Sequence, residues 1–274
     1  MDPAVDSRQA ITPEALHSRL RTRRLAQSVE FYESIDSTNR RALELASSGA
    51  PDGTLVLTEH QTRGRGRLTR IWHAPPHSSL LLSLILRPPL APHQAQRATM
   101  LCAIAAVEAI AETTGLAAGI KWPNDILIGD RKAGGILTEL QAQGNQLVTI
   151  VVGIGLNVNL DAAELPEVMT PATSLAGELG RPVARLPLLV DLLQRADALY
   201  ARMLGGWSPV ALWRQHLVTL GQSVRIATDQ GVLEGTATDV DADGALLVTH
   251  PSGQVQRILV GDVVGRAVPP AETP

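Results

Sequence analysis

The sequence predicts an α+β protein: a mixed, largely antiparallel sheet with flanking helices, followed by a small C-terminal β-barrel. Three observations support this fold class. Segments with a helical spacing of apolar residues alternate with short β-type segments up to about residue 217. Glycine-containing tight turns join several of those β-type segments, as in antiparallel hairpins. After residue 217 only short β-type segments follow, which is typical of a small barrel.

We place the domain boundaries at 1–28 for an N-terminal tail and short helix, 29–217 for the main domain and 218–268 for the barrel. A chain of 274 residues is long enough for two domains with separate cores. Its 45% hydrophobic and 19% charged residues are typical of a soluble globular protein. The net charge of −3 argues against nucleic-acid binding through bulk positive charge.

The cysteine count and the composition of the N-terminus indicate in which cellular compartment the protein is expected. Cys102 is the single cysteine, so neither an intramolecular disulfide nor a cysteine metal site can form, and core packing is its expected role. No apolar run reaches the length of a membrane-spanning helix, and the N-terminus has no apolar signal region. We therefore expect a cytoplasmic enzyme or binding protein with no membrane partner.

The first elements are a short helix, a strand and a second helix. Thr12 and the proline after it predict a helix start, and that helix runs to about Arg24. Val29–Ile35 alternates apolar and polar residues, as a half-buried strand does. Asp36–Asn39 then caps a helix that runs to about Ser48. An ordinary N-cap uses one side chain, so these adjacent polar side chains exceed that need.

The middle of the chain alternates strands with one long helix. Leu55–Thr58 and Ser78–Leu86 read as strands, and a long cationic loop joins them. Pro92–Thr114 has helical spacing, and Gly115 is a suitable C-cap. From residue 120 to residue 159 we predict antiparallel strands, with tight turns at 129–132 and at Gly144-Asn145.

Four glycines interrupt those last strands: Gly134, Gly135, Gly153 and Gly155. Glycine inside a strand costs stability and often marks the close approach of a ligand. Because the predicted strands are neighbours, one ligand could be what all four glycines make room for. Leu186–Met203 and Pro209–His216 are predicted helices. The barrel strands are expected at 223–227, 233–239, 245–249 and 255–259.

The cationic loop Gln61–Trp72 is the strongest functional signal. It interleaves two glycines with four arginines: Arg63, Arg65, Arg67 and Arg70. Glycine lets a ligand approach the backbone, and arginine offers a planar fork of donors that matches phosphate or carboxylate oxygens. A dinucleotide fingerprint would need a third glycine where Thr69 stands. An RNA-binding arginine-glycine tract would repeat. The remaining alternatives are an anion-binding loop and a solvated charged loop.

Metal ligation is not expected from the histidines near this loop. His73 and His77 have the spacing of a helical pair, but Pro75 and Pro76 prevent the helix that such a pair needs. We therefore predict no protein metal site.

Five motifs, in order and spacing, resemble those of the biotin protein ligases over residues 13–265. They are Ser37–Asn39, Gln61–Trp72, Lys121–Asp125, Lys132–Leu137 and Gly153–Asn157. The resemblance implies a catalytic domain of the class II synthetase type with an SH3-like barrel, in the form without an N-terminal DNA-binding domain. It also implies formation of biotinyl-5′-adenylate from biotin and ATP, and transfer of biotin to one lysine of a carrier domain.

The resemblance also implies the site residues. Arg65, Arg67, Lys121 and Lys132 would be catalytic, placing cations between two anionic reactants. The implied biotin site comprises Ser37, Thr38, Asn39, Gln61, Gly64, Arg65, Gly66, Arg67, Lys132, Gly135, Leu137, Gly153 and Gly155. The implied ATP site comprises Arg67, Trp72, Lys121, Asn124, Lys132 and Asn157. In this scheme Trp72 stacks on adenine, and Asn124 and Asn157 serve the nucleotide and Mg²⁺.

Two nearby residues have structural alternatives. Trp122 is expected in the core, because tryptophan is usually highly buried. Asp125 could hold the Lys121 segment by a salt bridge. Arg63 and Thr69 depart from the family pattern, which has a small residue and a glycine there, and extra bulk could alter loop closure.

The implied cofactors are ATP and Mg²⁺, with biotin as the substrate, and the implied partner is the biotin carboxyl carrier domain of acetyl-CoA carboxylase or a similar enzyme. No DNA partner is expected, and a homodimer is left open. Three alternatives remain: a lipoate-type ligase, a biotin-sensing transcription repressor and a non-enzymatic RNA-binding module.

Overall fold

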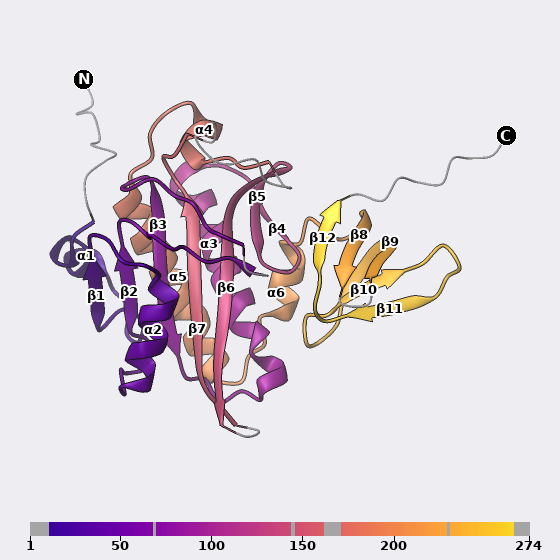
Figure 1. The fold of residues 1–274 in the computed structure, drawn as a ribbon, viewed down its shortest axis with the longest axis horizontal. Coiled ribbons are helices and arrows are strands. Elements are labelled where there is room, and N and C mark those ends of the chain that lie inside the picture. The colour runs from indigo at the N-terminus through magenta and orange to yellow at the C-terminus, as the bar shows by residue number, and fades with distance from the viewer. Residues whose placement is uncertain (1–10, 68–69, 144–145, 162–170, 229–230, 266–274) are drawn as a thin grey trace.

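The computed structural model describes residues 11–67, 70–143, 146–161, 171–228 and 231–265. These residues form a seven-stranded sheet and a separate five-stranded sheet (Figure 1). The larger sheet has the strand order β1-β2-β3-β7-β6-β5-β4. Its strands are β1 (Val29–Tyr32), β2 (Leu55–Thr58), β3 (Ser79–Leu86), β4 (Ala118–Lys121), β5 (Asp125–Ile128), β6 (Arg131–Gln143) and β7 (Gln146–Asn157). β1 runs parallel to β2 and the other ladders are antiparallel, which confirms the predicted mixed sheet.

Helices cover both faces of this sheet. They are α1 (Pro13–Arg19), α2 (Thr38–Ser47), the 3₁₀ helix η2 (Pro92–Gln94), α3 (Gln96–Thr114), α4 (Leu175–Leu179), α5 (Arg185–Leu204) and α6 (Val210–Gln215). Figure 1 shows α2 on one face and α3 with α5 on the other. Successive strand residues point to opposite faces. Val56 and Ile85 accordingly pack under α2, while Leu55, Leu57 and Leu84 belong to the larger core.

The long helix α3 is buried on nearly every side. Its small residues let it lie close to the sheet and to α5, and Gly115 ends it in the left-handed conformation with φ 76°. Cys102 is fully buried in this helix, as expected, and burial raises the pKa of its thiol to about 12. Such a thiol is a packing residue, because the reactive thiolate does not form near neutral pH.

The first helix is shorter than predicted. It ends at Arg19, where Leu20 turns to extended backbone, and does not continue to Arg24. The backbone amides of residues 23–25 instead donate hydrogen bonds to the Asp197 carboxylate on α5, at 2.8 to 2.9 Å. Asp197 is buried, so three charge-assisted bonds fix the chain in a non-helical turn. This partner is far away in the sequence and could not be predicted locally.

The second sheet holds β8 (Ser223–Thr228), β9 (Gly231–Val240), β10 (Leu246–Thr249), β11 (Val255–Ile258) and β12 (Asp262–Gly265). Its ladders are all antiparallel, in the order β11-β10-β9-β8-β12. The predicted β-type texture is confirmed, and β12 is a strand that the sequence analysis did not identify. The predicted turn at Gly144-Asn145 lies outside the described residues.

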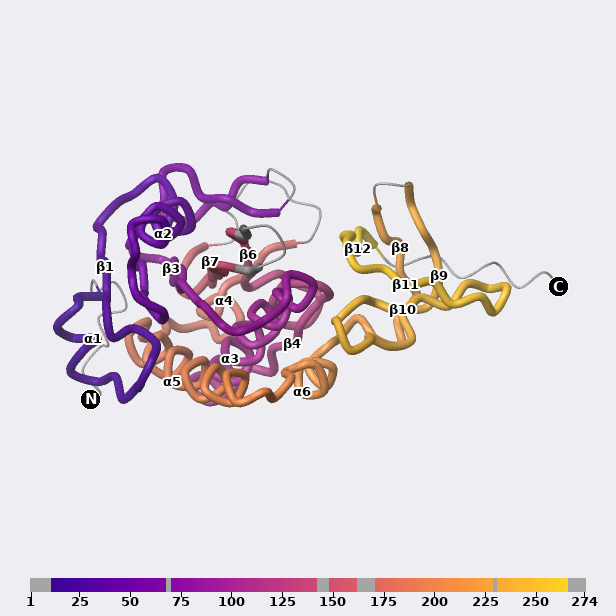
Figure 2. Tube along the Cα trace, turned by 90° about the horizontal axis from the view of Figure 1, so that it is seen from below, coloured from indigo at the N-terminus to yellow at the C-terminus, as the bar shows by residue number. Residues whose placement is uncertain are grey.

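The two sheets meet through a buried tryptophan. Figures 1 and 2 show the smaller sheet beside α6 and β4, at the end of the molecule away from α1. Trp122 is 1% exposed, and its indole N–H donates to the Gly244 carbonyl at 3.0 Å. Its backbone N–H donates to Thr219 Oγ1 at 2.8 Å. The expectation that Trp122 is a core residue is confirmed. None of the described helices has the length and hydropathy needed to cross a membrane.

Candidate active site

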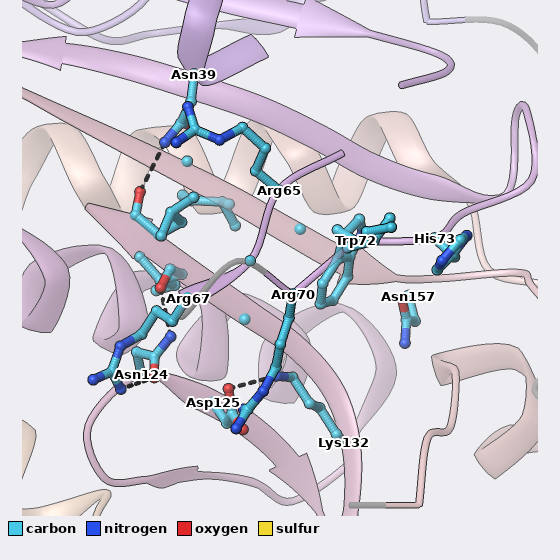
Figure 3. Close-up of a pocket in the computed structure, with 18 of the residues that line it drawn as sticks. Asn39, Arg65, Arg67, Arg70, Trp72, His73, Asn124, Asp125, Lys132 and Asn157 are labelled. Atoms are coloured by element: carbon cyan, nitrogen blue, oxygen red, sulfur yellow. Dashed lines mark hydrogen bonds and ion pairs between the residues drawn. The ribbon is translucent and has the colours of Figure 1, made fainter. Parts of the chain in front are cut away.

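A cavity of about 500 Å³ opens on the face of the larger sheet that carries α2 (Figure 3). Its floor is formed by β6 and β7, and its walls by the start of α2, the loop after β2, the segment between β4 and β5, and β12. Every predicted site residue except Gly64 lines it: Ser37, Thr38, Asn39, Gln61, Arg65, Gly66, Arg67, Trp72, Lys121, Asn124, Lys132, Gly135, Leu137, Gly153, Gly155 and Asn157. Cations from separated segments therefore share one cavity.

Polar side chains at the start of α2 form one end of the cavity. The backbone N–H of Thr38 donates to Gln61 Oε1 at 2.8 Å, and its hydroxyl lies 3.2 Å from the same oxygen. Ser37 precedes the helix in extended conformation without capping it through its side chain. The Ser37 hydroxyl does not cap the helix. This agrees with the expectation that the polar residues here do more than cap it.

Asn39 lines the cavity but its side chain is already bonded within the protein. Its Nδ2 donates to the Leu137 carbonyl at 3.2 Å and to Glu139 Oε2 at 2.9 Å. The Ser83 hydroxyl lies 2.6 Å from its Oδ1. At 3% exposure a polar side chain needs such partners. Asn39 thus organises the wall between α2 and β6 through these bonds.

The floor glycines make room for protein side chains in this structure. A Cβ on Gly153 would lie 2.1 Å from Asn39 Oδ1, and a Cβ on Gly155 would lie 2.7 Å from Trp72 Cε2. A Cβ on Gly135 would touch Lys132 Nζ at 3.4 Å and the Trp72 ring at 3.5 Å. The neighbours at these three positions are an amide, an indole and an ammonium group of the protein itself. These side chains would shape the space that a ligand occupies. Gly134 does not share this face, because a Cβ there would lie 2.9 Å from the Gly155 carbonyl oxygen and 3.1 Å from Leu156 Cδ1.

The arginine loop folds back on itself as a small hairpin. The Trp72 N–H donates to the Gly64 carbonyl at 2.9 Å, and the Gly66 N–H donates to the Arg70 carbonyl at 2.8 Å. Gly64 is not part of the cavity wall; a Cβ there would lie 2.4 Å from the Trp72 carbonyl oxygen. Gly64 therefore permits the close pairing of the two arms. Thr69 lies outside the described residues.

Two of the predicted catalytic cations are each paired with a carboxylate on the sheet. Arg65 Nη1 lies 3.1 Å from Glu139 Oε1 on β6, and Lys132 Nζ lies 2.6 Å from Asp125 Oδ1 on β5. Both pairs are partly exposed, so they orient the cations more than they stabilise the fold. Asp125 was considered as a partner for the Lys121 segment; its ion pair in the structure is with Lys132.

Arg67 is held from two sides. Its Nη1 donates to Asn124 Oδ1 at 3.1 Å and to Asp262 Oδ1 at 3.0 Å, and its Nη2 donates to the Gly261 carbonyl at 3.1 Å. Asn124 in turn donates to the Ile136 carbonyl at 2.7 Å. The guanidinium is thereby tied to both sheets. Figure 3 shows Arg67 directed toward Asn124.

Lys121 lines the cavity among charged side chains of both signs. Its pKa is lowered, first by burial and then by the positive charges of Lys132 and Arg70, while Asp125 and Asp262 oppose the shift. Neighbouring cations favour the neutral amine, and an anion placed among them would favour the ammonium form. The local excess of positive charge is what an anionic ligand would balance.

Two buried polar atoms of the cavity have no hydrogen-bond partner in the described part of the chain. They are Trp72 Nε1, a donor, and Asn157 Oδ1, an acceptor. The amide nitrogen of Asn157 donates to the Thr173 carbonyl at 3.0 Å, which fixes the orientation of the side chain. Buried unpaired groups are costly, so a ligand carrying both donors and acceptors would bind favourably there.

Within the described ranges no group of three histidine, cysteine, aspartate or glutamate side chains is arranged to hold a metal ion. His73 lines the cavity, whereas His77 lies 3.1 Å from Glu33 and 3.4 Å from Glu59. The two histidines do not act as a pair.

The sequence analysis missed two charged residues of the site, Glu139 and Asp262, and it named Arg70 only as an arginine of the cationic loop. Glu139 carried a signal only through its spacing, because it lies two residues from Leu137 and so shares the same face of β6. Asp262 gave no local sequence signal, because its partner Arg67 lies 195 residues away in the sequence.

Comparisons with known proteins agree with these features. The model of the Biotin/lipoate A/B protein ligase family matches residues 31–157, and that of the Biotin protein ligase C terminal domain matches residues 219–266. The chain is 36% identical over 247 residues to the Bifunctional ligase/repressor BirA of Bacillus subtilis (strain 168), covering 89% of this chain and 76% of that protein. It is 34% identical over 226 residues to a Biotin--[acetyl-CoA-carboxylase] ligase of Paracoccus denitrificans, covering 80% and 93%.

A solved structure is also similar. The biotin protein ligase of Aquifex aeolicus in complex with biotin and ATP superposes with a TM-score of 0.73 and is 27% identical. The match covers 86% of this chain and 97% of that one, so it includes both sheets.

Proposed function

The chain belongs to the biotin protein ligases, and on that premise we propose that its cavity forms biotinyl-5′-adenylate from biotin and ATP and then transfers biotin to a lysine of a carrier domain. One observation carries the proposal: Arg67, Lys121 and Lys132 come from three separate segments and line one cavity, which also contains the polar start of α2. Arg65 lies beside that polar start, because Glu139 bonds both Arg65 and Asn39. That arrangement suits a ligand with a carboxylate at one end and a polar ring at the other.

The first step joins two anions. An oxygen of the biotin carboxylate attacks the α-phosphorus of ATP, a new P–O bond forms, and the bond from that phosphorus to the oxygen bridging to the β-phosphate breaks to release pyrophosphate. Negative charge accumulates on the phosphoryl oxygens during this exchange. Cations fixed beforehand stabilise such charge without the cost of reorganising water. We assign this role to Arg67, Lys121 and Lys132, with Arg65 on the biotin carboxylate.

The second step is acyl transfer. The carrier lysine, as a free amine, attacks the carbonyl carbon of the adenylate, and the carbon–oxygen bond to AMP breaks. The phosphate of AMP is a far better leaving group than the oxide of a free carboxylate, which explains why the adenylate is made first. By the names of the relatives, we propose the biotin carrier of acetyl-CoA carboxylase as the acceptor.

The polar groups at the start of α2 would take the ureido ring of biotin. Burying the donors and acceptor of that ring without partners would be costly. Ser37, Thr38 and Gln61 provide hydroxyl and amide groups at that end of the cavity. Leu137 and the glycine floor would contact the apolar parts of the ligand. At the opposite wall, Trp72 would stack on adenine, and Asn157 would complete its hydrogen bonds on the nucleotide.

Mg²⁺ would need few protein ligands here, because it usually keeps several waters and is bound by one or two side-chain oxygens together with substrate phosphates. The residues fit that demand, since Asn157 offers a buried side-chain oxygen without a partner among the described residues. When bound, the ion would neutralise phosphate charge. We also propose a cytoplasmic location. Whether the chain forms a homodimer would be determined by sedimentation of the purified protein.

Transfer of labelled biotin tests the proposal with purified components. The chain, ATP, Mg²⁺ and a biotin carrier domain should give labelled carrier, and a carrier with its target lysine changed to alanine should stay unlabelled. Pyrophosphate release with biotin and with lipoate in parallel separates the two ligase classes. Equal release with both acids, or none with biotin, would refute the assignment.

A further inference from the structure

The carboxylate of Glu139, beside the cavity, joins two of its walls. Glu139 lies on β6, two residues beyond Leu137, with its side chain 21% exposed. Its Oε1 lies 3.1 Å from Arg65 Nη1 on the arginine loop. Its Oε2 accepts a hydrogen bond from Asn39 Nδ2 on α2 at 2.9 Å. One carboxylate on the sheet thus connects the loop to the helix, and Figure 3 shows Arg65 directed toward Asn39.

These contacts belong to a polar network that reaches the loop at a second point. The Ser83 hydroxyl lies 2.6 Å from Asn39 Oδ1 and 2.8 Å from Thr38 Oγ1. The Thr38 backbone N–H donates to Gln61 Oε1 at 2.8 Å. The loop is therefore attached to α2 and the sheet at two points four residues apart. The members of this network that line the cavity are Thr38, Asn39, Gln61 and Arg65.

The attachment through Arg65 depends on how firmly its acceptor is held. Asn39 is 3% exposed and also donates to the Leu137 carbonyl at 3.2 Å, so it fixes one oxygen of Glu139 from the buried side. The other oxygen is presented to Arg65, whose side chain is 52% exposed. Among the described residues this is the one ion pair that Arg65 makes. Orienting a long side chain in advance removes part of the ordering cost of ligand binding.

We propose that Glu139 is a positioning residue for biotin binding, which holds Arg65 and the arginine loop against the wall formed by α2 and β6. This inference rests on the proposed ligase function and deepens it, because it assigns part of the biotin affinity to a residue outside the cavity lining. Glu139 acts through Arg65 and does not itself contact the reacting atoms.

A purely electrostatic role for Glu139 would have the opposite effect on biotin affinity. The carboxylate of biotin is an anion, so a nearby negative charge repels it, and removing that charge would tighten binding. If Glu139 positions Arg65, removing the charge weakens binding, because the ligand must then order the side chain and the loop. The sign of the change in the biotin Kd therefore separates the two roles.

Glu139→Gln removes the charge with little change in shape. Its side-chain oxygen can still accept from Asn39, while its NH₂ group has no lone pair to offer Arg65. The variant therefore breaks the contact with the loop and keeps the contact with α2. Glu44→Gln is the matched control: Glu44 lies on α2 outside the cavity lining and pairs with two arginines of the same helix at 3.1 and 3.3 Å.

The experiment measures the Kd of biotin alone by isothermal titration calorimetry, together with thermal unfolding, for wild type and both variants. For Glu139→Gln we expect the Kd to rise roughly 2- to 5-fold, the range that a partly exposed ion pair supports. Glu44→Gln should keep the wild-type Kd, and the two variants should have similar Tm values. In pyrophosphate release, Glu139→Gln should raise the KM for biotin and change kcat little, as loss of uniform binding does.

The double variant Arg65→Met, Glu139→Gln tests whether Glu139 acts through Arg65. In the Arg65→Met background the second change should weaken biotin binding little or not at all. An equal further weakening there would overturn the proposal, as would a Kd of Glu139→Gln at or below that of wild type. If wild type neither binds biotin nor releases pyrophosphate with biotin and ATP, the ligase function fails, and this inference fails with it.

Discussion

Adding one methyl group at Gly155 should weaken ATP binding while leaving the fold intact. Gly155 lies on the cavity face of β7, under the indole of Trp72. A Cβ at this position would lie 2.7 Å from Trp72 Cε2 and 2.8 Å from Cζ2. Such contacts are shorter than carbon atoms tolerate, so in Gly155→Ala the indole must move away from the floor and into the cavity.

The expected losses of stability and of ATP binding in Gly155→Ala depend on whether the Trp72 ring can shift. Overpacking a closed core costs about 1–3 kcal/mol, but here the ring can shift into open space, so the loss of stability should stay below about 1 kcal/mol. Stacking of a base on an aromatic ring contributes roughly 1–3 kcal/mol. Losing about half of that contribution, roughly 0.5–1.5 kcal/mol, would raise the KM for ATP roughly 2- to 12-fold.

Gly134→Ala is the matched control on the opposite face of the neighbouring strand. A Cβ at Gly134 would lie 2.9 Å from the Gly155 carbonyl oxygen and 3.1 Å from Leu156 Cδ1. Neither the backbone nor the filled core can shift easily. We expect about 1–3 kcal/mol of destabilisation, seen as a fall in Tm of roughly 2–4 °C per kcal/mol, with an unchanged KM for ATP.

Pyrophosphate release at varied ATP and thermal unfolding measure the two effects separately. The reasoning holds if Gly155→Ala changes mainly the KM for ATP and Gly134→Ala changes mainly Tm. It is refuted if Gly155→Ala leaves that KM unchanged, or if the two variants lose equal stability.

Four further predictions follow from the site and the fold. Lys132→Ala should abolish adenylate formation, and normal pyrophosphate release would contradict its role. Arg67→Gly should release adenylate and label unrelated lysines, so carrier labelling as specific as wild type would remove Arg67 from retention. Because the pKa of Lys121 is lowered in the ligand-free site, kcat/KM should fall on the alkaline side at a lower pH than for an ordinary lysine, and Lys121→Arg should move that alkaline limb to higher pH. An unshifted alkaline limb in Lys121→Arg would refute the assignment. The lowered pKa of Lys121 also makes the free energy of unfolding rise with pH between its folded and unfolded pKa values, because the unfolded chain binds more protons there. Asp197→Ala should cost about 1–3 kcal/mol of unfolding free energy, since the buried Leu25 amide and two part-buried amides lose their acceptor, and no measurable loss by denaturant titration would refute this.

The sequence determined which residue types line the cavity. Local patterns made the arginine loop and the strand glycines stand out, whereas the set of site residues came from the resemblance of five motifs to the biotin protein ligases. The arginine loop, the Lys121 segment and the glycine strands were identified from such patterns and from their order. The structure brings the predicted site residues to one cavity except Gly64, which pairs with Trp72. Gly134, which was grouped with three other strand glycines, packs against Leu156 and Ile126 instead.

Only the tertiary structure decided how the charges are paired. The partners of Arg65, Arg67 and Lys132 are Glu139, Asp262 and Asp125. An ion pair depends on two side chains meeting within a few ångströms. For residues 195 positions apart, that distance depends on how the two sheets pack, which no local pattern encodes. The end of α1 at Arg19 has the same origin, because its cause is a carboxylate on α5.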